Sequence, residues 1–96
     1  MKDKIAIVTG GSRGIGAAIV KRFAAAGAKV YFTYANSESA AAELAAETGA
    51  SALRCRQGDP VAIAEAVDKI YFESGAIDVL VNNAGITRDG FMMLSL

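Results

Sequence analysis

Short runs of β-branched and aliphatic residues alternate along this chain with longer stretches in which apolar residues recur every three or four positions. The short runs predict strands buried on both faces, and the longer stretches predict amphipathic helices. The expected strands are residues 4–9, 28–34, 51–56 and 77–82, and the expected helices are residues 14–26, 37–48 and a third that opens at Asp59-Pro60. Strands and helices that alternate over short connections favour a parallel α/β sheet with right-handed crossovers, flanked by helices. The expected strand order is 3-2-1-4, half of a doubly wound sheet.

Each helix is expected to bury one apolar stripe against this sheet. The expected stripes are Ile15, Ile19, Phe23 and Ala26 in the first helix and Ile63, Val67, Ile70 and Tyr71 in the third. Asp59 is a typical N-cap residue, and Pro60 suits the first helical position after it. In the fourth strand, residues 79–81 suit burial on both faces. No further strand is expected within 96 residues to pair with its outer side, so we expect that side to carry unpaired N–H and C=O groups that recruit a partner.

The charges of the chain are balanced, because ten Lys and Arg residues stand against ten Asp and Glu residues with no His. Neither nucleic acid nor an acidic membrane is therefore an expected partner. Cys55 is the single cysteine, so neither an intrachain disulfide nor a thiolate and imidazole metal site is expected. No apolar run is long enough for a signal peptide or a membrane span. The sequence predicts one domain over residues 1–96, in the cytoplasm.

The turn between the first strand and the first helix reads Thr9-Gly-Gly-Ser-Arg-Gly-Ile-Gly16. Its glycines at positions 10, 14 and 16 allow a tight turn, a close approach of a ligand to the backbone, and close packing of the helix on the sheet. Free N–H groups at the start of a helix attract phosphate, so the turn predicts a pyrophosphate site. No Lys-Ser/Thr pair follows Gly16, which excludes a Walker A loop. A glycine-rich turn without a ligand is the alternative.

The end of the second strand bears on the choice of nicotinamide cofactor. An NAD enzyme usually places an acid there for the adenosine ribose, whereas Tyr34-Ala-Asn-Ser37 is neutral here. Arg13, within the glycine turn, is within reach of a 2′-phosphate, and Asn36 and Ser37 are neutral hydrogen-bond donors beside it. The combination favours NADP over NAD. The alternative for Arg13 is a solvated loop charge, and Glu38 is more simply a surface charge at a helix start.

Two motifs together resemble the short-chain dehydrogenase/reductase family: Thr9-Gly-x-x-x-Gly-x-Gly16, and Asn82-Asn-Ala-Gly85 after the fourth strand. Residues 82–90 and Arg13 are more closely similar to the 3-oxoacyl-(acyl carrier protein) reductases of fatty acid biosynthesis. The resemblance covers essentially the whole chain but only the first part of such an enzyme. It implies a Rossmann-like fold, NADPH as cofactor, reduction of a β-keto acyl thioester to a hydroxyacyl thioester, and a homo-oligomer.

The resemblance also implies which residues surround the cofactor. These are Gly10, Ser12, Arg13, Gly14, Ile15 and Gly16 at the phosphates and ribose, Asn36 and Ser37 at the 2′-phosphate, Asp59 at the adenine amino group, Asn83, Ala84 and Gly85 at the adenosine, and Ile86 near the nicotinamide. Two structural alternatives stay open. Asp59 is equally suited to capping a helix, and the paired asparagines at 82 and 83 are suited to satisfying backbone groups at the strand end.

The catalytic groups of that family have no counterpart among these residues. Such reductases use a tyrosine with a lysine four positions on, assisted by a serine and a helix asparagine. The tyrosines here are Tyr31, Tyr34 and Tyr71, followed four positions later by Ala35, Glu38 and Gly75. No catalytic residue is therefore expected within these 96 residues.

Three hypotheses follow. The first is the cofactor-binding part of an NADPH-dependent 3-oxoacyl reductase, which pairs with a C-terminal half or with further copies. The second is a free-standing nucleotide-binding module without catalytic activity. The third is a structural remnant with no ligand.

Overall fold

A computed structural model describes residues 1–56, 59–83 and 93–95 of the chain. Its elements are β1 (Ile5–Val8), α1 (Gly14–Ala25), β2 (Lys29–Tyr34), α2 (Glu38–Thr48), β3 (Ser51–Arg54), α3 (Pro60–Ser74), β4 (Val79–Asn82) and β5 (Met93–Ser95). Every expected strand and helix forms, and each end either coincides with the expected bound or lies one or two residues inside it. No helix within these residues is long and apolar enough to cross a membrane.

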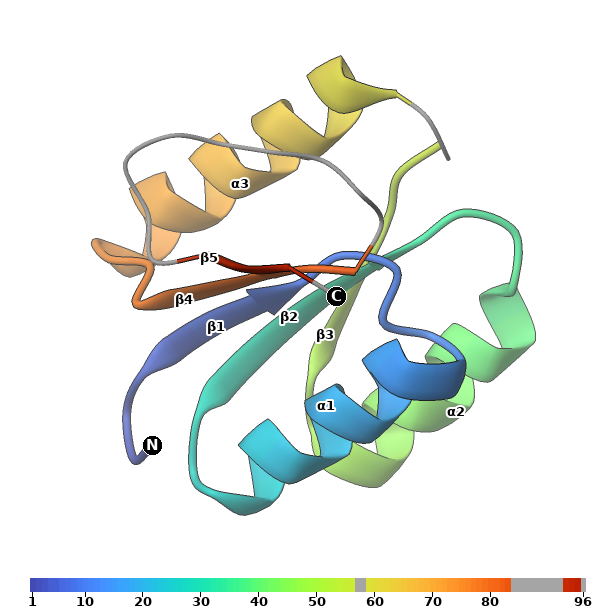
Figure 1. The fold of residues 1–96 in the computed structure, drawn as a ribbon, viewed down its shortest axis with the longest axis horizontal. Coiled ribbons are helices and arrows are strands. Elements are labelled where there is room, and N and C mark those ends of the chain that lie inside the picture. The colour runs from blue at the N-terminus through green and yellow to red at the C-terminus, as the bar shows by residue number, and fades with distance from the viewer. Residues whose placement is uncertain (57–58, 84–92, 96) are drawn as a thin grey trace.

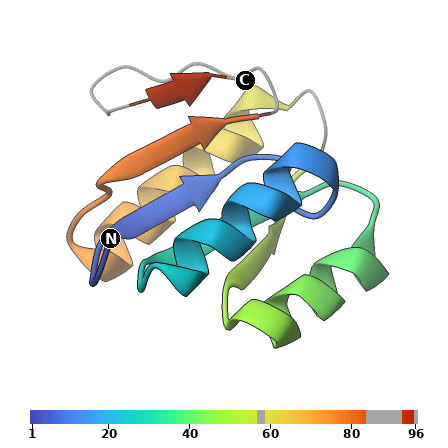
Figure 2. The same cartoon turned by 60° about the horizontal axis from the view of Figure 1, so that its bottom comes forward.

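The strands form one parallel sheet in the order β3-β2-β1-β4-β5. The predicted order 3-2-1-4 is therefore confirmed, with β1 at the centre, where Val8 pairs with Phe32 on one side and Val81 on the other. Because the strands are parallel, their carboxyl ends share one edge of the sheet, as the arrowheads of β1, β4 and β5 show in Figure 2. The residues directly after β1, β2, β3 and β4 lie at this edge, hereafter the carboxyl edge.

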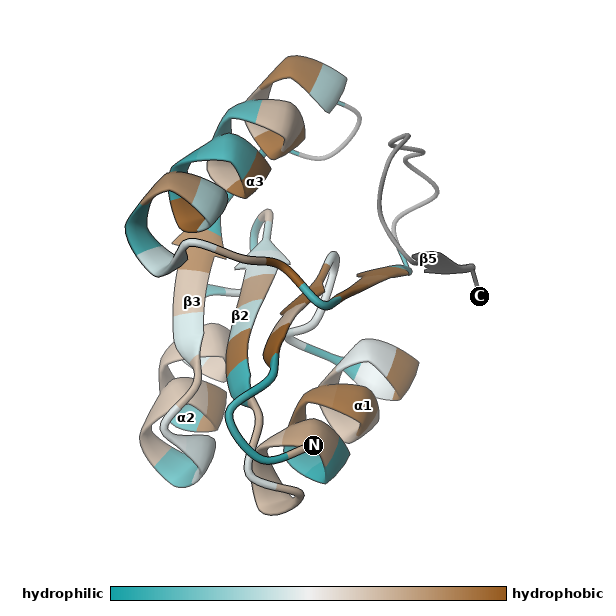
Figure 3. Cartoon of the chain, turned by 90° about the vertical axis from the view of Figure 1, so that its left-hand side faces the viewer, coloured by the Kyte–Doolittle hydropathy of each residue, from teal (hydrophilic) through white to brown (hydrophobic). Residues whose placement is uncertain are grey.

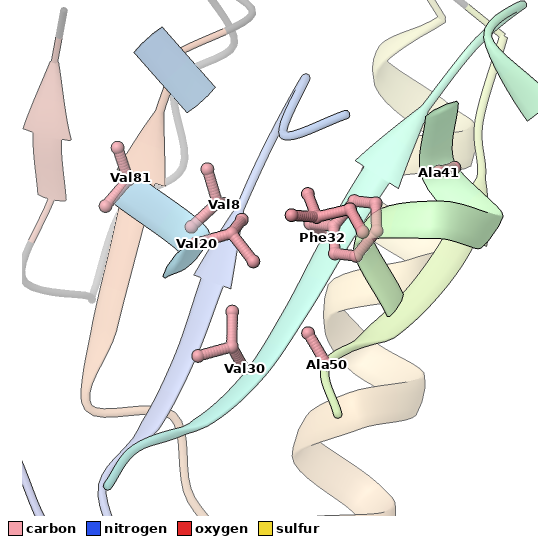
Figure 4. Packing of buried hydrophobic residues seen from close by; sticks show 8 residues of the cluster. Val8, Val20, Val30, Phe32, Ala41, Ala50 and Val81 are labelled. Carbon is pink, nitrogen blue, oxygen red and sulfur yellow. The ribbon is translucent and has the colours of Figure 1, made fainter. Parts of the chain in front are cut away.

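Helices cover both faces of the sheet, with α1 and α2 on one side and α3 on the other (Figure 1). Successive strand residues point to opposite faces, so β1 contributes Val8 to one hydrophobic cluster and Ile7 to the other. In the α1 and α2 layer, Val8, Val20 and Phe32 are fully buried (Figure 4). The hydropathy colouring shows the apolar strands between the two helical layers (Figure 3). The strands are thus buried on both faces, as their composition predicts.

The buried faces of α1 and α3 differ from the expected stripes. In α1 the buried residues are Gly16 and Val20, while Ile15 is 66% exposed. Because Gly16 has no side chain, α1 approaches the β1–α1 turn most closely at that residue, and its buried face centres there. Ile15, the preceding residue, therefore points away from the buried face. In α3 the buried residues are Ile63, Val67 and Ile70, whereas Tyr71 is 50% exposed. Ala26 is the C-cap residue of α1 and is exposed. The expected burial of Ile15, Ala26 and Tyr71 is wrong.

The expected unpaired edge of β4 is also wrong. β5 lies parallel to β4 on the side away from β1, with Leu80 in register with Met93 and Asn82 with Ser95. β4 therefore has a hydrogen-bonded neighbour on each side, and the outer strands of the sheet are β3 and β5. This edge of β4 gives no ground for expecting a partner chain.

Candidate functional site

The turn between β1 and α1 is anchored to β2 by Thr33. The backbone N–H of Gly10 donates to Thr33 Oγ1 at 3.0 Å, and the N–H of Gly11 donates to the Thr33 carbonyl at 2.9 Å. Thr33 is only 3% exposed. A buried threonine near the end of the neighbouring strand thus fixes where the turn leaves the sheet. Sequence reasoning missed this residue, and its signal was a hydroxyl in an otherwise apolar strand.

Asn83 joins the two motifs singled out from the sequence. Its Nδ2 donates to the Gly10 carbonyl oxygen at 2.9 Å, across 73 residues of chain. The parallel pairing of β1 with β4 makes this contact possible, because both strands end at the carboxyl edge. The bond satisfies a backbone carbonyl of the turn, which is the structural alternative left open for this asparagine pair. It also fixes the turn against the end of β4.

Gly16 is the position at which α1 packs against the turn. A Cβ atom built there would collide with the Gly10 carbonyl oxygen and lie 2.8 Å from Asn83 Nδ2. Gly11 has a comparable role, since its Cβ would lie 2.7 Å from Phe32 Cβ. The close contact at Gly16 is therefore between α1 and the turn, whereas Gly11 packs against Phe32 of β2 and Val20 of α1. The sequence argument did not assign that role to Gly11.

Gly14 is different, because an added Cβ would meet nothing within 4 Å. Its φ of +60° lies in the left-handed region that favours glycine, and it is the first residue of α1. The glycine therefore leaves open space directly at the start of the helix. A ligand that approaches the helix end there meets backbone and no side chain of residue 14.

The start of α1 is suited to an anion. Arg13 is its N-cap residue but makes no side-chain cap, and the first turn contains no acidic residue. No described residue accepts a hydrogen bond from the N–H groups of residues 14–16. By contrast, α2 carries Glu38 in its first turn and α3 is capped by Asp59. Unfilled N–H donors and the positive end of the helix dipole both favour a phosphate at α1.

An open hollow of about 540 Å³ lies at the ends of β2 and β3, on the same carboxyl edge of the sheet. Ala35, Asn36, Arg54 and Arg56 line it. The sequence argument placed Asn36 here but did not include the two arginines. The missed signal was the alternation in Arg54-Cys-Arg56 after a strand that pairs with β2. Ser37, the other expected donor, is the N-cap residue of α2 and half-buried.

Known proteins have sequences similar to that of this chain. The sequence profile of the short chain dehydrogenase family matches residues 4–94. The chain belongs to the short-chain dehydrogenase family. The chain is 54% identical over 83 residues to the cyclic-di-GMP-binding biofilm dispersal mediator protein of Escherichia coli K12, covering 86% of the chain and 33% of that protein. It is 50% identical over 94 residues to the 3-oxoacyl-(acyl-carrier-protein) reductase FabG of the same organism, covering 96% of the chain and 38% of the reductase.

A solved structure of BdcA in complex with NADPH has a TM-score of 0.80 and 51% identity to this chain. That comparison covers 94% of this chain and 35% of BdcA, and it confirms the Rossmann-like α/β fold. The chain spans little more than a third of the length of the relatives it matches.

Asp59 is the N-cap residue of α3, which is the structural alternative to its expected contact with adenine. Its Oδ1 accepts from the Ala62 N–H at 3.0 Å and so caps α3. It lies near the buried thiol of Cys55, where burial first and the Asp59 carboxylate second raise the pKa above its ordinary value of 9.0. The thiol, which lies 3.9 Å from the Ala62 carbonyl oxygen, is therefore protonated at neutral pH and poorly suited to act as a nucleophile.

Three expected site residues, Ala84, Gly85 and Ile86, lie outside the described residues. Among the residues that the structure does describe, no group of three or more His, Cys, Asp or Glu side chains is placed to hold a metal ion.

Proposed function

We propose that this short-chain dehydrogenase chain is the NADPH-binding part of an oxidoreductase. The observation that carries the proposal is the uncapped start of α1, with free N–H groups and open space at Gly14. A hollow lined by two arginines lies at the same carboxyl edge of the sheet. A dinucleotide with a phosphorylated ribose carries anionic groups for both features. The solved NADPH complex of BdcA, 51% identical to this chain, supports the choice of cofactor.

The proposed roles follow the positions of the residues. The turn from Gly10 to Gly16, with Ser12, Arg13 and Ile15, surrounds the pyrophosphate and ribose. Asn36 and Ser37 lie at the end of β2, nearest the adenosine ribose. In the motif after β4, Asn83, Ala84 and Gly85 are proposed to line the adenosine. Ile86 is proposed to lie near the nicotinamide.

Asp59 already has a structural role in this chain. Its carboxylate already holds the first turn of α3 through Oδ1, so a contact with the adenine amino group would fall to the other oxygen. The proposal therefore keeps Asp59 as an adenine ligand only in addition to its capping role.

When bound, NADPH supplies the hydride for a reduction. The residues of this chain bind and orient the cofactor and keep the turn rigid, and no catalytic acid is assigned among them. The proposed substrate of the whole enzyme is a β-keto acyl thioester, reduced to the hydroxyacyl thioester as in fatty acid biosynthesis. The 50% identity to the 3-oxoacyl reductase and the 49% identity to an acetoacetyl-CoA reductase of Shinella zoogloeoides support this class.

The proposal includes a cytoplasmic location and assembly with further copies or with the remaining part of such an enzyme. This assembly is proposed from the chain's membership of the short-chain dehydrogenase family. Neither nucleic acid nor a membrane is proposed as a partner.

Calorimetric titration of the purified chain with NADPH tests the cofactor assignment. We expect saturable binding at one site, with NADH binding more weakly. If neither dinucleotide binds a folded chain, the proposed function is wrong.

A second candidate function is nucleotide binding without turnover. The observation that favours it is the 54% identity to a protein described by its binding of cyclic-di-GMP. Titration with cyclic-di-GMP separates the two. Tight binding that NADPH does not displace would favour the binding module, whereas no binding leaves the oxidoreductase assignment.

A further inference from the structure

We propose that Arg54 and Arg56, together with Asn36, form the site that selects the 2′-phosphate of NADPH. The inference rests on the proposed function and deepens it, because it assigns cofactor selection to β3. The glycine turn, where the sequence argument placed that selection, would then contribute mainly to binding the pyrophosphate.

The backbone fixes the position of both arginines. Arg54 is in register with Tyr34, and the Cys55 N–H donates to the Tyr34 carbonyl at 2.8 Å, so the pairing with β2 continues past the end of β3. Cys55 packs into the hydrophobic cluster on the α3 side. Its two neighbours instead line the hollow with Asn36. This alternation brings two guanidinium groups to one hollow at the carboxyl edge.

The charge of the hollow is uncompensated within the described residues. Its lining contains Arg54 and Arg56 and no acidic residue. The ion pair that the structure shows joins Lys21 to Glu47, and neither arginine of the hollow takes part in it. Both arginines are exposed, and among the described residues no hydrogen bond or ion pair engages either guanidinium group. Paired guanidinium forks are well suited to a phosphate dianion, because each can donate two parallel N–H bonds.

The size of the hollow agrees with this occupant. Its volume of about 540 Å³ accommodates a phosphorylated ribose with part of an adenine ring. Asn36 adds an amide at the end of β2, where a carboxylate would repel the phosphate. Arg13 is exposed at the start of α1 and is not among the residues that line the hollow.

The experiment measures dissociation constants of the chain for NADPH, NADH, 2′,5′-ADP and 5′-AMP by calorimetry. The variants are Arg54→Ala, Arg56→Ala, the double variant and the double lysine replacement. Arg22→Ala, which removes an exposed arginine in the last turn of α1, is the matched control. Arg13→Ala is measured in parallel.

The double alanine variant should lose roughly tenfold or more of its NADPH affinity, since charge-assisted contacts are the strong ones. Its NADH affinity should not change, which also shows that the fold is intact. Its 2′,5′-ADP affinity should fall to that of 5′-AMP. Arg22→Ala should behave as the unmodified chain, and the lysine variant should recover part of the preference.

An unchanged ratio of NADPH to NADH affinity in the double alanine variant overturns the proposal. The same holds if Arg13→Ala abolishes the preference while the double variant keeps it. If neither dinucleotide binds the unmodified chain, the proposed function fails. Arginine-dependent binding of 2′,5′-ADP would then still support the phosphate site, and its absence would overturn the site as well.

Discussion

At the scale of single residues, two glycines of one turn meet opposite requirements. Gly16 is needed because its neighbours leave no room for a Cβ, and Gly14 because its φ is +60° while its surroundings are empty. The first supports the packing of α1 on the turn, and the second leaves the helix start open. A glycine pattern in a sequence contains both requirements without distinguishing them.

Gly16→Ala should destabilise the chain. In an ordinary helix position this replacement stabilises by about 0.5–1 kcal/mol, because glycine loses more backbone freedom on folding. Here the new methyl group meets the Gly10 carbonyl oxygen and Asn83 Nδ2, and overpacking of this kind costs about 1–3 kcal/mol. Urea denaturation gives the sign directly. A variant as stable as the unmodified chain, or more stable, would show that the contact relaxes without cost.

At the scale of elements, the start of α1 differs from the starts of the other two described helices, and the difference favours a ligand at α1. Among the three helices of the described part, α3 is capped by Asp59 and α2 carries Glu38 in its first turn. The first turn of α1 has neither a side-chain cap nor an acid. The helix whose start is least satisfied by its own chain is therefore the one beside the glycine turn.

Asp59→Ala should lower the free energy of unfolding by about 0.5–2 kcal/mol, the usual cost of losing an N-cap. Asp59→Asn keeps an oxygen acceptor for the Ala62 N–H and should lose less. Neither variant should change NADPH affinity by as much as the arginine variants do. Thermal unfolding and calorimetry on the same samples check this. A large loss of NADPH affinity with unchanged stability would instead make Asp59 an adenine ligand.

The sequence predicted the elements better than the faces they present. Strand order follows from the alternation of strands and helices, because short connections leave few alternatives. The outward position of Ile15 did not follow, since it depends on how closely Gly16 lets α1 approach. β5 has three residues and no alternating pattern of its own. Its pairing with β4 depends on where the chain returns after that strand.

The sequence likewise predicted some residues of the candidate site and missed others. The glycine turn and the Asn82-Asn83 pair were identified because their residue types are informative in themselves. Thr33, Arg54 and Arg56 were missed because only the register of β1, β2 and β3 brings them to that turn and to the hollow. Site residues whose position depends on the register between neighbouring strands could therefore not be predicted from the sequence.

At the scale of the whole molecule, the balance of charge hides a local excess. The formal net charge is +0, which argues against a polyanion as partner, yet two arginines share one hollow without an acid in its lining. A small anionic ligand responds to the local charge, while a polymer responds to the surface as a whole. The structure is therefore compatible with a nucleotide cofactor and with the absence of nucleic acid binding.

The 96-residue chain should not reduce acetoacetyl thioesters above background, even with NADPH bound. It contains no Tyr-x-x-x-Lys, and the loss of a general acid alone costs roughly 10²–10⁴-fold in rate. Loss of NADPH absorbance over time, with heat-inactivated chain as control, measures this. Turnover by a contaminant-free preparation would mean that a proton donor exists among these residues.

The central claim is that a dinucleotide binds with its pyrophosphate at the start of α1, and a matched pair of glycine variants tests it most directly. Gly14→Val and Gly49→Val both place a branched side chain at a positive φ with nothing within 4 Å, so both should lose about 1–2 kcal/mol of stability through backbone strain. Only Gly14→Val places that side chain at the helix start. The measurement is the dissociation constant for NADPH of each folded variant. We predict that Gly14→Val abolishes binding while Gly49→Val keeps the affinity of the unmodified chain. Unchanged affinity in Gly14→Val would contradict the claim.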